Sequence, residues 1–233
     1  MNWPSRSDPA QPSVRFTDRR EAGRRLAALL REYEHDERVI VLGLPRGGVP
    51  VAFEVAEALD APLDAFVVRK LGVPGHEEYA MGAIASGGIR VLNHDAIREL
   101  HLPLETVDAV ERAERVELER RERLYRGARG PIALRGRIVL LVDDGLATGS
   151  TMLAAVAAVR TQEPARIVVA APVASRDACE ALGRRADACV SVAQPDPFYG
   201  VGLWYLDFTQ TTDDEVRRLL AARAAREPAA ADH

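Results

Sequence analysis

One segment, residues 138–151 with the sequence IVLLVDDGLATGST, limits the fold of this chain more than any other. Its first five residues are apolar and unbroken, which is typical of a strand buried on both faces of a parallel sheet. Residues 152–159, MLAAVAAV, follow as an apolar helix of good helix formers. A buried strand that leads through a short turn into a helix is the repeating unit of α/β proteins. The segment therefore predicts a parallel sheet covered by helices.

The turn between this strand and helix has the composition of a phosphate site. Gly145, Ala147 and Gly149 let the backbone approach a ligand closely. Ser150 and Thr151 add hydroxyl groups beside the free N–H groups with which the helix begins. We expect a phosphate to bind here. The alternative is an ordinary strand-to-helix turn with an acidic edge.

Two adjacent carboxylates, Asp143 and Asp144, precede the turn. They follow the carboxyl end of the strand, where α/β sheets bind ligands, and they would repel a bare phosphate. Hydroxyl groups or a metal ion would satisfy them. A ribose 5-phosphate carries both a phosphate and a diol, and it fits the turn and the acids together. The Lys of a Walker loop and the glycines of a dinucleotide fingerprint are both absent from this segment.

Strand and helix patterns alternate along much of the chain. Strands are predicted over residues 39–44, 63–69 and 167–172, and helices over residues 49–59 and from Ser175 onward. Strand, crossover helix and parallel strand in this order are typical of the doubly wound α/β class. We therefore predict an α/β fold with a doubly wound parallel sheet.

The alternation breaks between residues 72 and 137, where we expect an insertion over the sheet. A Gly-rich stretch is followed by a short strand or hairpin near residues 84–92 and a charged helix over about residues 104–126. In that helix, Glu precedes Arg by four residues at four places, which stabilises an exposed helix. A solvated helix face is our interpretation, and a partner-binding helix is the alternative.

Composition narrows the classes of partner. The 31 basic and 35 acidic residues give a formal charge of −4, which offers no electrostatic reason to bind nucleic acid or an anionic membrane.

We expect residues 14–224 to form one domain between disordered tails at 1–13 and 225–233. No secretory signal or membrane span is evident, which favours a cytoplasmic protein. Cys179 and Cys189 lack metal-ligand spacing, and we interpret both as buried thiols rather than a disulfide.

A second strand ends in a Gly-rich turn that carries a cation. Arg46, Gly47 and Gly48 lie within the sequence VLGLPRGGV. Backbone N–H groups freed by the glycines and a guanidinium able to bind bidentately suit a pyrophosphate. Such turns are also common in α/β proteins without any ligand.

A third strand ends on Arg69 and Lys70, which can reach one ligand only past the strand's end because side chains alternate along a strand.

The segment 138–151 resembles the phosphoribosyl-pyrophosphate (PRPP) loop of the type I phosphoribosyltransferases, in which two acids follow a hydrophobic strand and precede a Thr-Gly-x-Thr turn. The resemblance implies that fold with a hood or insertion subdomain, PRPP as the donor, and Mg²⁺ as the cofactor. Asp143 and Asp144 would hold the ribose hydroxyls and, through these or water, the Mg²⁺. The 5-phosphate would lie on Ala147, Thr148, Gly149, Ser150 and Thr151. Hypoxanthine-type members carry Asp in place of Ala147, so a hypoxanthine-like acceptor is not favoured.

The resemblance also covers the two cation-bearing segments. In the family, the loop corresponding to Arg46, Gly47 and Gly48 binds pyrophosphate and often contains a non-proline cis peptide, which would here be Pro45–Arg46. Adenine-type members have a similar order of residues in the mobile loop that closes over the reaction centre, here Arg69, Lys70, Pro74, Gly75, Glu78, Tyr79 and Gly82. Among the titratable groups His76, Glu77 and Glu78, Glu78 is the first candidate to handle a proton of the acceptor.

An aromatic-rich segment near the end of the chain, PFYGVGLWYLDFTQ at residues 197–210, is similar to the base-binding hood of purine-type members. By that resemblance Phe198 would stack on the base, Val201 would offer main-chain contacts, and Asp207 would lie nearby. Simple core packing of the aromatic residues is the alternative.

These features predict a Mg²⁺-dependent phosphoribosyltransferase of a bacterial branch of the family. It would move the 5-phosphoribosyl group of PRPP to a nucleobase or related small-molecule acceptor and release pyrophosphate, with Arg69, Lys70, Glu78, Asp143 and Asp144 as the catalytic residues. The acceptor stays open. A PRPP-sensing regulator with little or no catalysis and a non-catalytic domain of an enzyme partner are the alternatives. The resemblance also implies a homodimer.

Overall fold

The computed structural model describes residues 15–127, 130 and 132–226, with the side chains of Glu77 and Glu78 left out. The tail predicted at residues 1–13 and most of the tail predicted at 225–233 lie outside these residues. Among the residues described, no helix is both long and apolar enough to cross a membrane.

A five-stranded parallel sheet forms the centre of the fold, with the strand order β2-β1-β6-β7-β8. Every residue of β1 and β6 is buried, as their apolar sequences predict. These two neighbouring strands are in register from Val39 and Ile138 to Gly43 and Val142. The order of the strands along the chain reverses at this pair, which makes it the topological switch point of the sheet. The strands are β1 (Val39–Gly43), β2 (Leu63–Ala65), β6 (Ile138–Val142), β7 (Arg166–Val173) and β8 (Ala188–Ala193).

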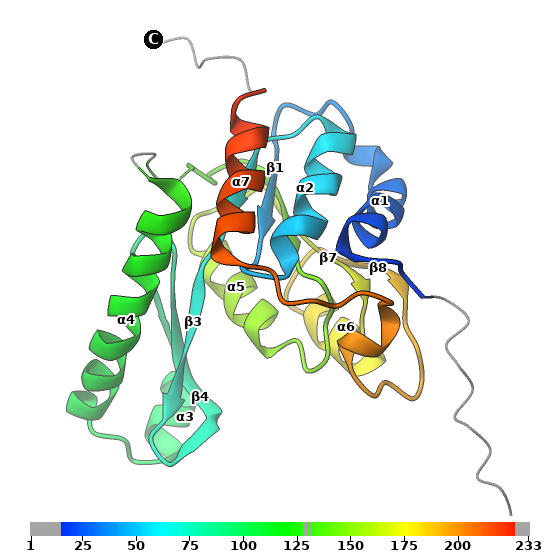
Figure 1. The fold of residues 1–233 in the computed structure, drawn as a ribbon. Coiled ribbons are helices and arrows are strands. Elements are labelled where there is room, and N and C mark those ends of the chain that lie inside the picture. The colour runs from blue at the N-terminus through cyan, green and yellow to red at the C-terminus, as the bar shows by residue number, and fades with distance from the viewer. Residues whose placement is uncertain (1–14, 128–129, 131, 227–233) are drawn as a thin grey trace, which may run out of the picture.

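Helices cover both faces of this sheet (Figure 1). Alternate residues of β1 divide between two core clusters: Val39 and Val41 pack with α1, α2 and α7, and Ile40 and Leu42 pack with α5 and α6. The prediction of a doubly wound α/β sheet is confirmed. The helices are α1 (Arg19–Leu29), α2 (Gly48–Leu59), α5 (Ser150–Arg160), α6 (Arg176–Gly183) and α7 (Asp213–Ala224), with short 3-10 helices η1 (Arg31–Tyr33) and η2 (Val201–Trp204).

The insertion is a second sheet with two helices. It contains the antiparallel strands β3 (Val68–Val73), β4 (His76–Ala85) and β5 (Ile89–Leu92), followed by α3 (His94–Glu99) and α4 (Leu104–Arg126). Figure 1 shows β3 and β4 running beside α4, with α3 at their far end. The predicted bounds of the charged helix are confirmed, and so are three of its four Glu–Arg pairs, which are Glu111–Arg115, Glu117–Arg121 and Glu122–Arg126.

The predicted single strand over residues 63–69 is wrong. The β2 strand ends at Ala65, and β3 begins at Val68 in the other sheet. At the crossing, the Phe66 N–H donates to the Gly43 carbonyl of the central sheet, while the Val67 N–H donates to Ser86 Oγ at the antiparallel one. Only Phe66 and Val67 separate the two strands, so the apolar pattern does not reveal the change of sheet. The Gly-rich stretch after it is a β3–β4 hairpin rather than a loop.

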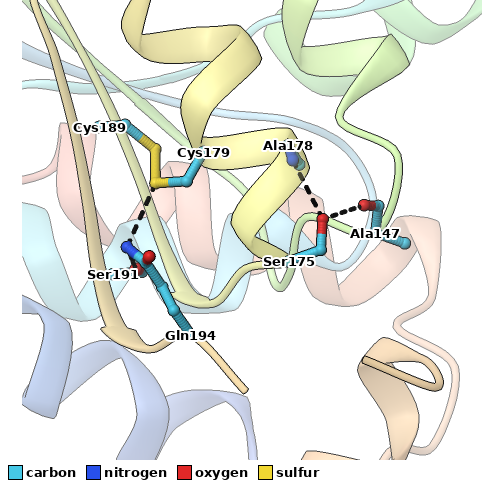
Figure 2. The surroundings of a disulfide bond; sticks show 7 residues. All are labelled: Ala147, Ser175, Ala178, Cys179, Cys189, Ser191 and Gln194. Atoms are coloured by element: carbon cyan, nitrogen blue, oxygen red, sulfur yellow. Dashed lines mark hydrogen bonds between the residues drawn. A yellow bond between two sulfur atoms is a disulfide. The ribbon is translucent and has the colours of Figure 1, made fainter. Parts of the chain in front are cut away.

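The interpretation of both cysteines as free thiols is also wrong. Cys179 in α6 and Cys189 in β8 form a disulfide, with their Cα atoms 5.9 Å apart (Figure 2). This separation lies within the usual range for disulfides. The physical reason is that α6 returns through a short turn and packs on the strand that follows it. That packing brings together two side chains whose spacing in the sequence predicts no pairing.

Candidate active site

The loops that follow β1 and β6 meet at the switch point. The Leu44 N–H donates to the Val142 carbonyl at 2.9 Å, which holds the two strand ends together. A Cβ atom placed on Gly47 would lie 2.0 Å from Asp144 Oδ2, and one on Gly48 would lie 2.7 Å from the Val142 carbonyl oxygen. Only glycine fits at either position. The structure therefore brings the loop of Arg46 directly against the acid pair, and the Pro45–Arg46 peptide is cis, as the resemblance implies.

The acid pair is held in a largely buried environment. Asp144 Oδ2 accepts a 2.8 Å hydrogen bond from Arg19 Nε, and the Arg19 and Asp144 side chains are only 11% and 16% exposed. The Asp144 N–H donates to Asp143 Oδ1 at 2.9 Å. Burial, and next the charge of Asp144, raise the pKa of Asp143; burial also raises the pKa of Asp144, against the opposing effect of Arg19. A ligand that brings hydroxyl donors or a cation would stabilise both carboxylates.

The predicted phosphate loop occupies the start of α5. Gly149 is the residue before this helix and has φ +70°, a conformation that favours glycine. Thr148 Oγ1 accepts from the Ser150 N–H at 3.4 Å and lies 3.2 Å from Ser150 Oγ. An open hollow of about 180 Å³ lies here, lined by Asp143, residues 145–152 and Val201. The N–H groups and hydroxyls of a helix start thus face a hollow shared with a carboxylate, which suits a sugar phosphate.

The loop is supported from behind by α6. Ser175 caps α6 by accepting from the Ala178 N–H at 3.1 Å, and its hydroxyl donates to the Ala147 carbonyl at 2.6 Å (Figure 2). One side chain therefore ties the phosphate loop to α6. The same helix carries Cys179, so the disulfide to β8 lies one turn from this contact.

The structure brings one of the two predicted hood residues to the phosphate loop. Val201 packs on Gly145, where an added Cβ would lie only 2.4 Å from Val201 Cγ1. Phe198 instead packs against a buried cluster that includes Phe16 and Tyr205. Its position matches the alternative of core packing. Asp207 is exposed and accepts from both the N–H and the hydroxyl of Thr209, so its carboxylate serves a local turn.

The three predicted catalytic residues of the insertion belong to the β3–β4 hairpin. Arg69 and Lys70 are consecutive residues inside β3 and point to opposite faces of its sheet. Arg69 Nε donates to Glu114 of α4 at 2.6 Å, so its charge is paired there. The expectation that both cations project past a strand end is therefore wrong. Glu78 belongs to β4, and its side chain is outside the description.

Two residues around the acid pair were missed by sequence reasoning. Arg19 is one of four arginines in α1, a pattern typical of a solvated helix face. It pairs with a carboxylate 125 residues away. Tyr205 lies just after η2, and its hydroxyl donates to the Asp144 carbonyl at 2.5 Å. The aromatic-rich hood pattern points to Tyr205 as a packing residue but does not indicate this hydrogen bond.

The donor set can be compared with what a metal ion requires. Within the described part of the chain, no group of three or more His, Cys, Asp or Glu side chains is arranged to hold a metal. Asp143 and Asp144 supply two carboxylates. Mg²⁺ is commonly held by one or two carboxylates together with water and substrate phosphates. The acid pair therefore fits a Mg²⁺ ion that arrives with a phosphorylated ligand.

Comparison with known proteins identifies the family. The profile of the phosphoribosyl transferase domain matches residues 75–196. The crystal structure of TT1426 from Thermus thermophilus is 44% identical, covers 90% of this chain and 99% of its own, and superimposes with a TM-score of 0.83. Rv0571c, a provisionally named phosphoribosyl transferase of Mycobacterium tuberculosis, is 50% identical over 201 residues, which are 86% of this chain but 45% of the relative. The chain thus spans about half the length of that relative. The chain belongs to the phosphoribosyl transferase family.

Proposed function

We propose that this protein transfers the 5-phosphoribosyl group of PRPP to a nucleophilic small molecule and releases pyrophosphate. One observation carries the proposal: the loop of Arg46 packs against the acid pair at the switch point, so that a cation, two carboxylates and a phosphate loop share one edge of the sheet. A ligand with a diol between a phosphate and a pyrophosphate has the matching order of groups.

Each part of the donor has a counterpart in the site. The turn and helix start at residues 148–152 suit the 5-phosphate, because the first N–H groups of a helix have no acceptor within the helix and the hydroxyls of Thr148 and Ser150 lie beside them. Asp143 and Asp144 suit the ribose hydroxyls as hydrogen-bond acceptors. Arg46 suits the pyrophosphate: among the described residues it forms no ion pair, and Gly47 and Gly48 keep its loop close to the acids.

In the reaction, the bond between the anomeric carbon and the pyrophosphate oxygen breaks, and the oxygen keeps the electron pair. A lone pair of the acceptor forms the new bond to that carbon, and the acceptor loses a proton to a base. The positive charge that develops on the ring is stabilised by the two nearby carboxylates. Arg46 stabilises the negative charge of the leaving group. Positioning and electrostatics therefore provide most of the proposed catalysis.

Mg²⁺ is the proposed cofactor, held by Asp143 and Asp144 through water or the ribose hydroxyls. When bound, it would neutralise part of the pyrophosphate charge.

We also propose that Arg69, Lys70 and Glu78 act when the β3–β4 hairpin closes over the bound donor, with Glu78 as the candidate base. For Arg69, this role requires the Glu114 pair to open. A homodimer and a cytoplasmic location stay predictions. Light scattering would measure the oligomeric state, and cell fractionation would measure the location.

The acceptor would enter beside Val201, which borders the hollow together with the phosphate loop. Ala147 is exposed and offers no carboxylate, so the loop itself cannot exchange a proton with the acceptor. The proposal therefore places no restriction on the acceptor beyond a nucleophilic atom able to reach the anomeric carbon. Phe198 would contribute only packing beneath the hood.

The test is pyrophosphate release from PRPP and Mg²⁺, measured with a panel of nucleobases and other nucleophiles. Asp144→Asn should lower turnover by at least about 100-fold, because it removes a charge from the reacting centre. Asp95→Asn is the matched control, since Asp95 is 78% exposed on α3 and should leave the rate unchanged. Wild-type turnover in the Asp144→Asn variant would refute the proposal. Tight PRPP binding without release for any acceptor would instead support the PRPP-sensing regulator.

A further inference from the structure

Arg19 occupies a central position that the proposed reaction leaves without a role. Its Nε donates to Asp144 Oδ2 at 2.8 Å, and its Nη1 donates to the Thr209 carbonyl at 2.7 Å. The guanidinium carbon lies 4.0 Å from the centre of the Phe208 ring. With 11% exposure, this side chain is nearly as buried as many core residues. Two hydrogen bonds and two rings, those of Phe208 and Tyr205, thus define its orientation.

The residues just before α1 are hydrogen-bonded to residues 204–207, at and just after η2. The Phe16 N–H donates to the Trp204 carbonyl at 2.8 Å, and the Leu206 N–H donates back to the Phe16 carbonyl at 2.8 Å. The Asp207 N–H donates to the Thr17 carbonyl at 2.9 Å. This pairing places Arg19, two residues later, at a defined point above the acid pair. The backbone hydrogen bonds of the fold therefore determine where Arg19 lies, and the flexibility of its side chain does not.

Asp144 is held on several sides. Arg19 engages Oδ2, the Tyr205 hydroxyl donates to the main-chain carbonyl at 2.5 Å, and Gly47 leaves no room beyond Oδ2. Rotation of the carboxylate would break the ion pair or collide with the loop of Arg46. Arg19 engages Oδ2, and within the described residues no other side chain donates to Oδ1, so this oxygen can accept from a ligand hydroxyl.

We propose that Arg19 is a positioning residue that fixes the Asp144 carboxylate in the orientation used for the hydroxyl groups of the donor. It also balances one of the two negative charges, so that a donor carrying phosphates meets a weaker repulsion. Lysine cannot replace it fully, because Arg19 donates from two separate nitrogens, Nε and Nη1, and the single nitrogen of an ammonium cannot occupy both positions. The inference rests on the proposed function only in naming PRPP as the ligand.

The first experiment measures PRPP binding in the presence of Mg²⁺ by calorimetry. Arg19→Gln should weaken binding about tenfold or more, as expected for loss of a charge-assisted hydrogen bond, and Arg19→Lys should recover part of it. Arg24→Gln is the matched control, because Arg24 lies on the same helix, is 58% exposed and contacts Glu54 instead. Adding Arg19→Gln to Asp144→Asn should cause little further loss, since the two residues act through one contact.

The second experiment needs no ligand. Carbon NMR follows the titration of the Asp144 carboxyl in the free protein, where Arg19 in α1, Asp143 beside it and the Tyr205 hydroxyl face this group. Arg19→Gln should raise the pKa of Asp144, while Arg19→Lys and Arg24→Gln should shift it less.

The two experiments separate the possible failures. Unchanged PRPP affinity together with an unchanged Asp144 titration in Arg19→Gln would overturn the role of Arg19. Failure of the wild-type protein to bind PRPP would refute the proposed function, while the titration would still report on the positioning of Asp144. If Arg19→Gln does not fold, Arg19→Lys decides the question, because full affinity and a wild-type titration in that variant also overturn the inference.

Discussion

Replacing Gly47 by alanine tests whether contact between the two loops is required for activity. The new Cβ would lie 2.0 Å from Asp144 Oδ2 and 2.7 Å from its Cγ. Real Cβ atoms essentially never approach another atom within 3.0 Å, so the loop or the carboxylate must move by at least 1.0 Å. Arg19 Nε would be 3.2 Å from the same carbon and must give way too. The strain therefore falls on the hydrogen bond between Arg19 and Asp144.

The magnitude follows from that hydrogen bond. A shift of this size lengthens a 2.8 Å contact beyond hydrogen-bonding distance. A hydrogen bond to a charged group contributes about 1.5 to 3 kcal/mol, so the free energy of unfolding should fall by about that amount. Displacing a catalytic group by about 1 Å can lower activity about 100-fold. We therefore expect Gly47→Ala to fold with reduced stability and to lose about two orders of magnitude in kcat/KM.

Urea denaturation and pyrophosphate release measure the two effects. Gly183→Ala is the matched control, because a Cβ at Gly183 meets nothing within 4 Å, and both quantities should stay near wild type. A Gly47→Ala variant with wild-type stability and turnover would refute the reasoning, since it would show that the two loops are free to separate. A stability loss alone would show that the contact is structural but not needed for the reaction.

Three further predictions follow from the surroundings of the site. The pKa of Asp143 is raised by burial and by its neighbouring carboxylate, so the folded protein binds the proton more tightly than the unfolded chain, and stability is lost as pH rises. Asp143→Asn should therefore raise the free energy of unfolding at neutral pH and lower turnover, with the stability gain disappearing below pH 3.8 in urea titrations. The disulfide between Cys179 and Cys189 spans 10 residues, so Cys179→Ser should lower the free energy of unfolding by about 2 to 3 kcal/mol, and reductant should affect only the wild type. Gly145→Ala should weaken PRPP binding in calorimetry about tenfold by displacing Val201, and adding Val201→Ala should restore it; no recovery would contradict the packing argument.

Local sequence patterns were most informative where all parts of a feature lie in one contiguous segment. The five apolar residues of β6, the acid pair and the glycine turn are contiguous, so strand, carboxylates and helix start can be read together. The bounds of α4 were predicted well for a similar reason, since its Glu–Arg pairs repeat at helical spacing. Contacts within four residues stabilise α4, whereas β6 takes its hydrogen bonds from β1 and β7 and is recognised only by its unbroken apolar pattern.

Predictions were less successful where they depended on which sheet a strand joins or which distant residue a side chain contacts. Residues 63–69 have the pattern of one strand, yet they cross between two sheets. An extended chain has the same periodicity in either sheet, so the sequence does not show the crossing. The sequence likewise does not show that Arg69 pairs with Glu114, or that Phe198 packs against the cluster of Phe16 and Tyr205. Each outcome depends on a partner distant in the sequence.

The sequence by itself determined the doubly wound class and the run of strand, acid pair and glycine turn, because each is a contiguous pattern of burial and chemistry. Phosphate binding at that turn stays a prediction. Only the tertiary structure decided which side chains surround that pair. Arg19 reaches Asp144 across 125 residues of sequence, and it does so because the start of α1 pairs with the segment after η2. Gly47 and Tyr205 join them from two other connections. Such meetings depend on how layers pack, a property of the whole chain that no local pattern contains.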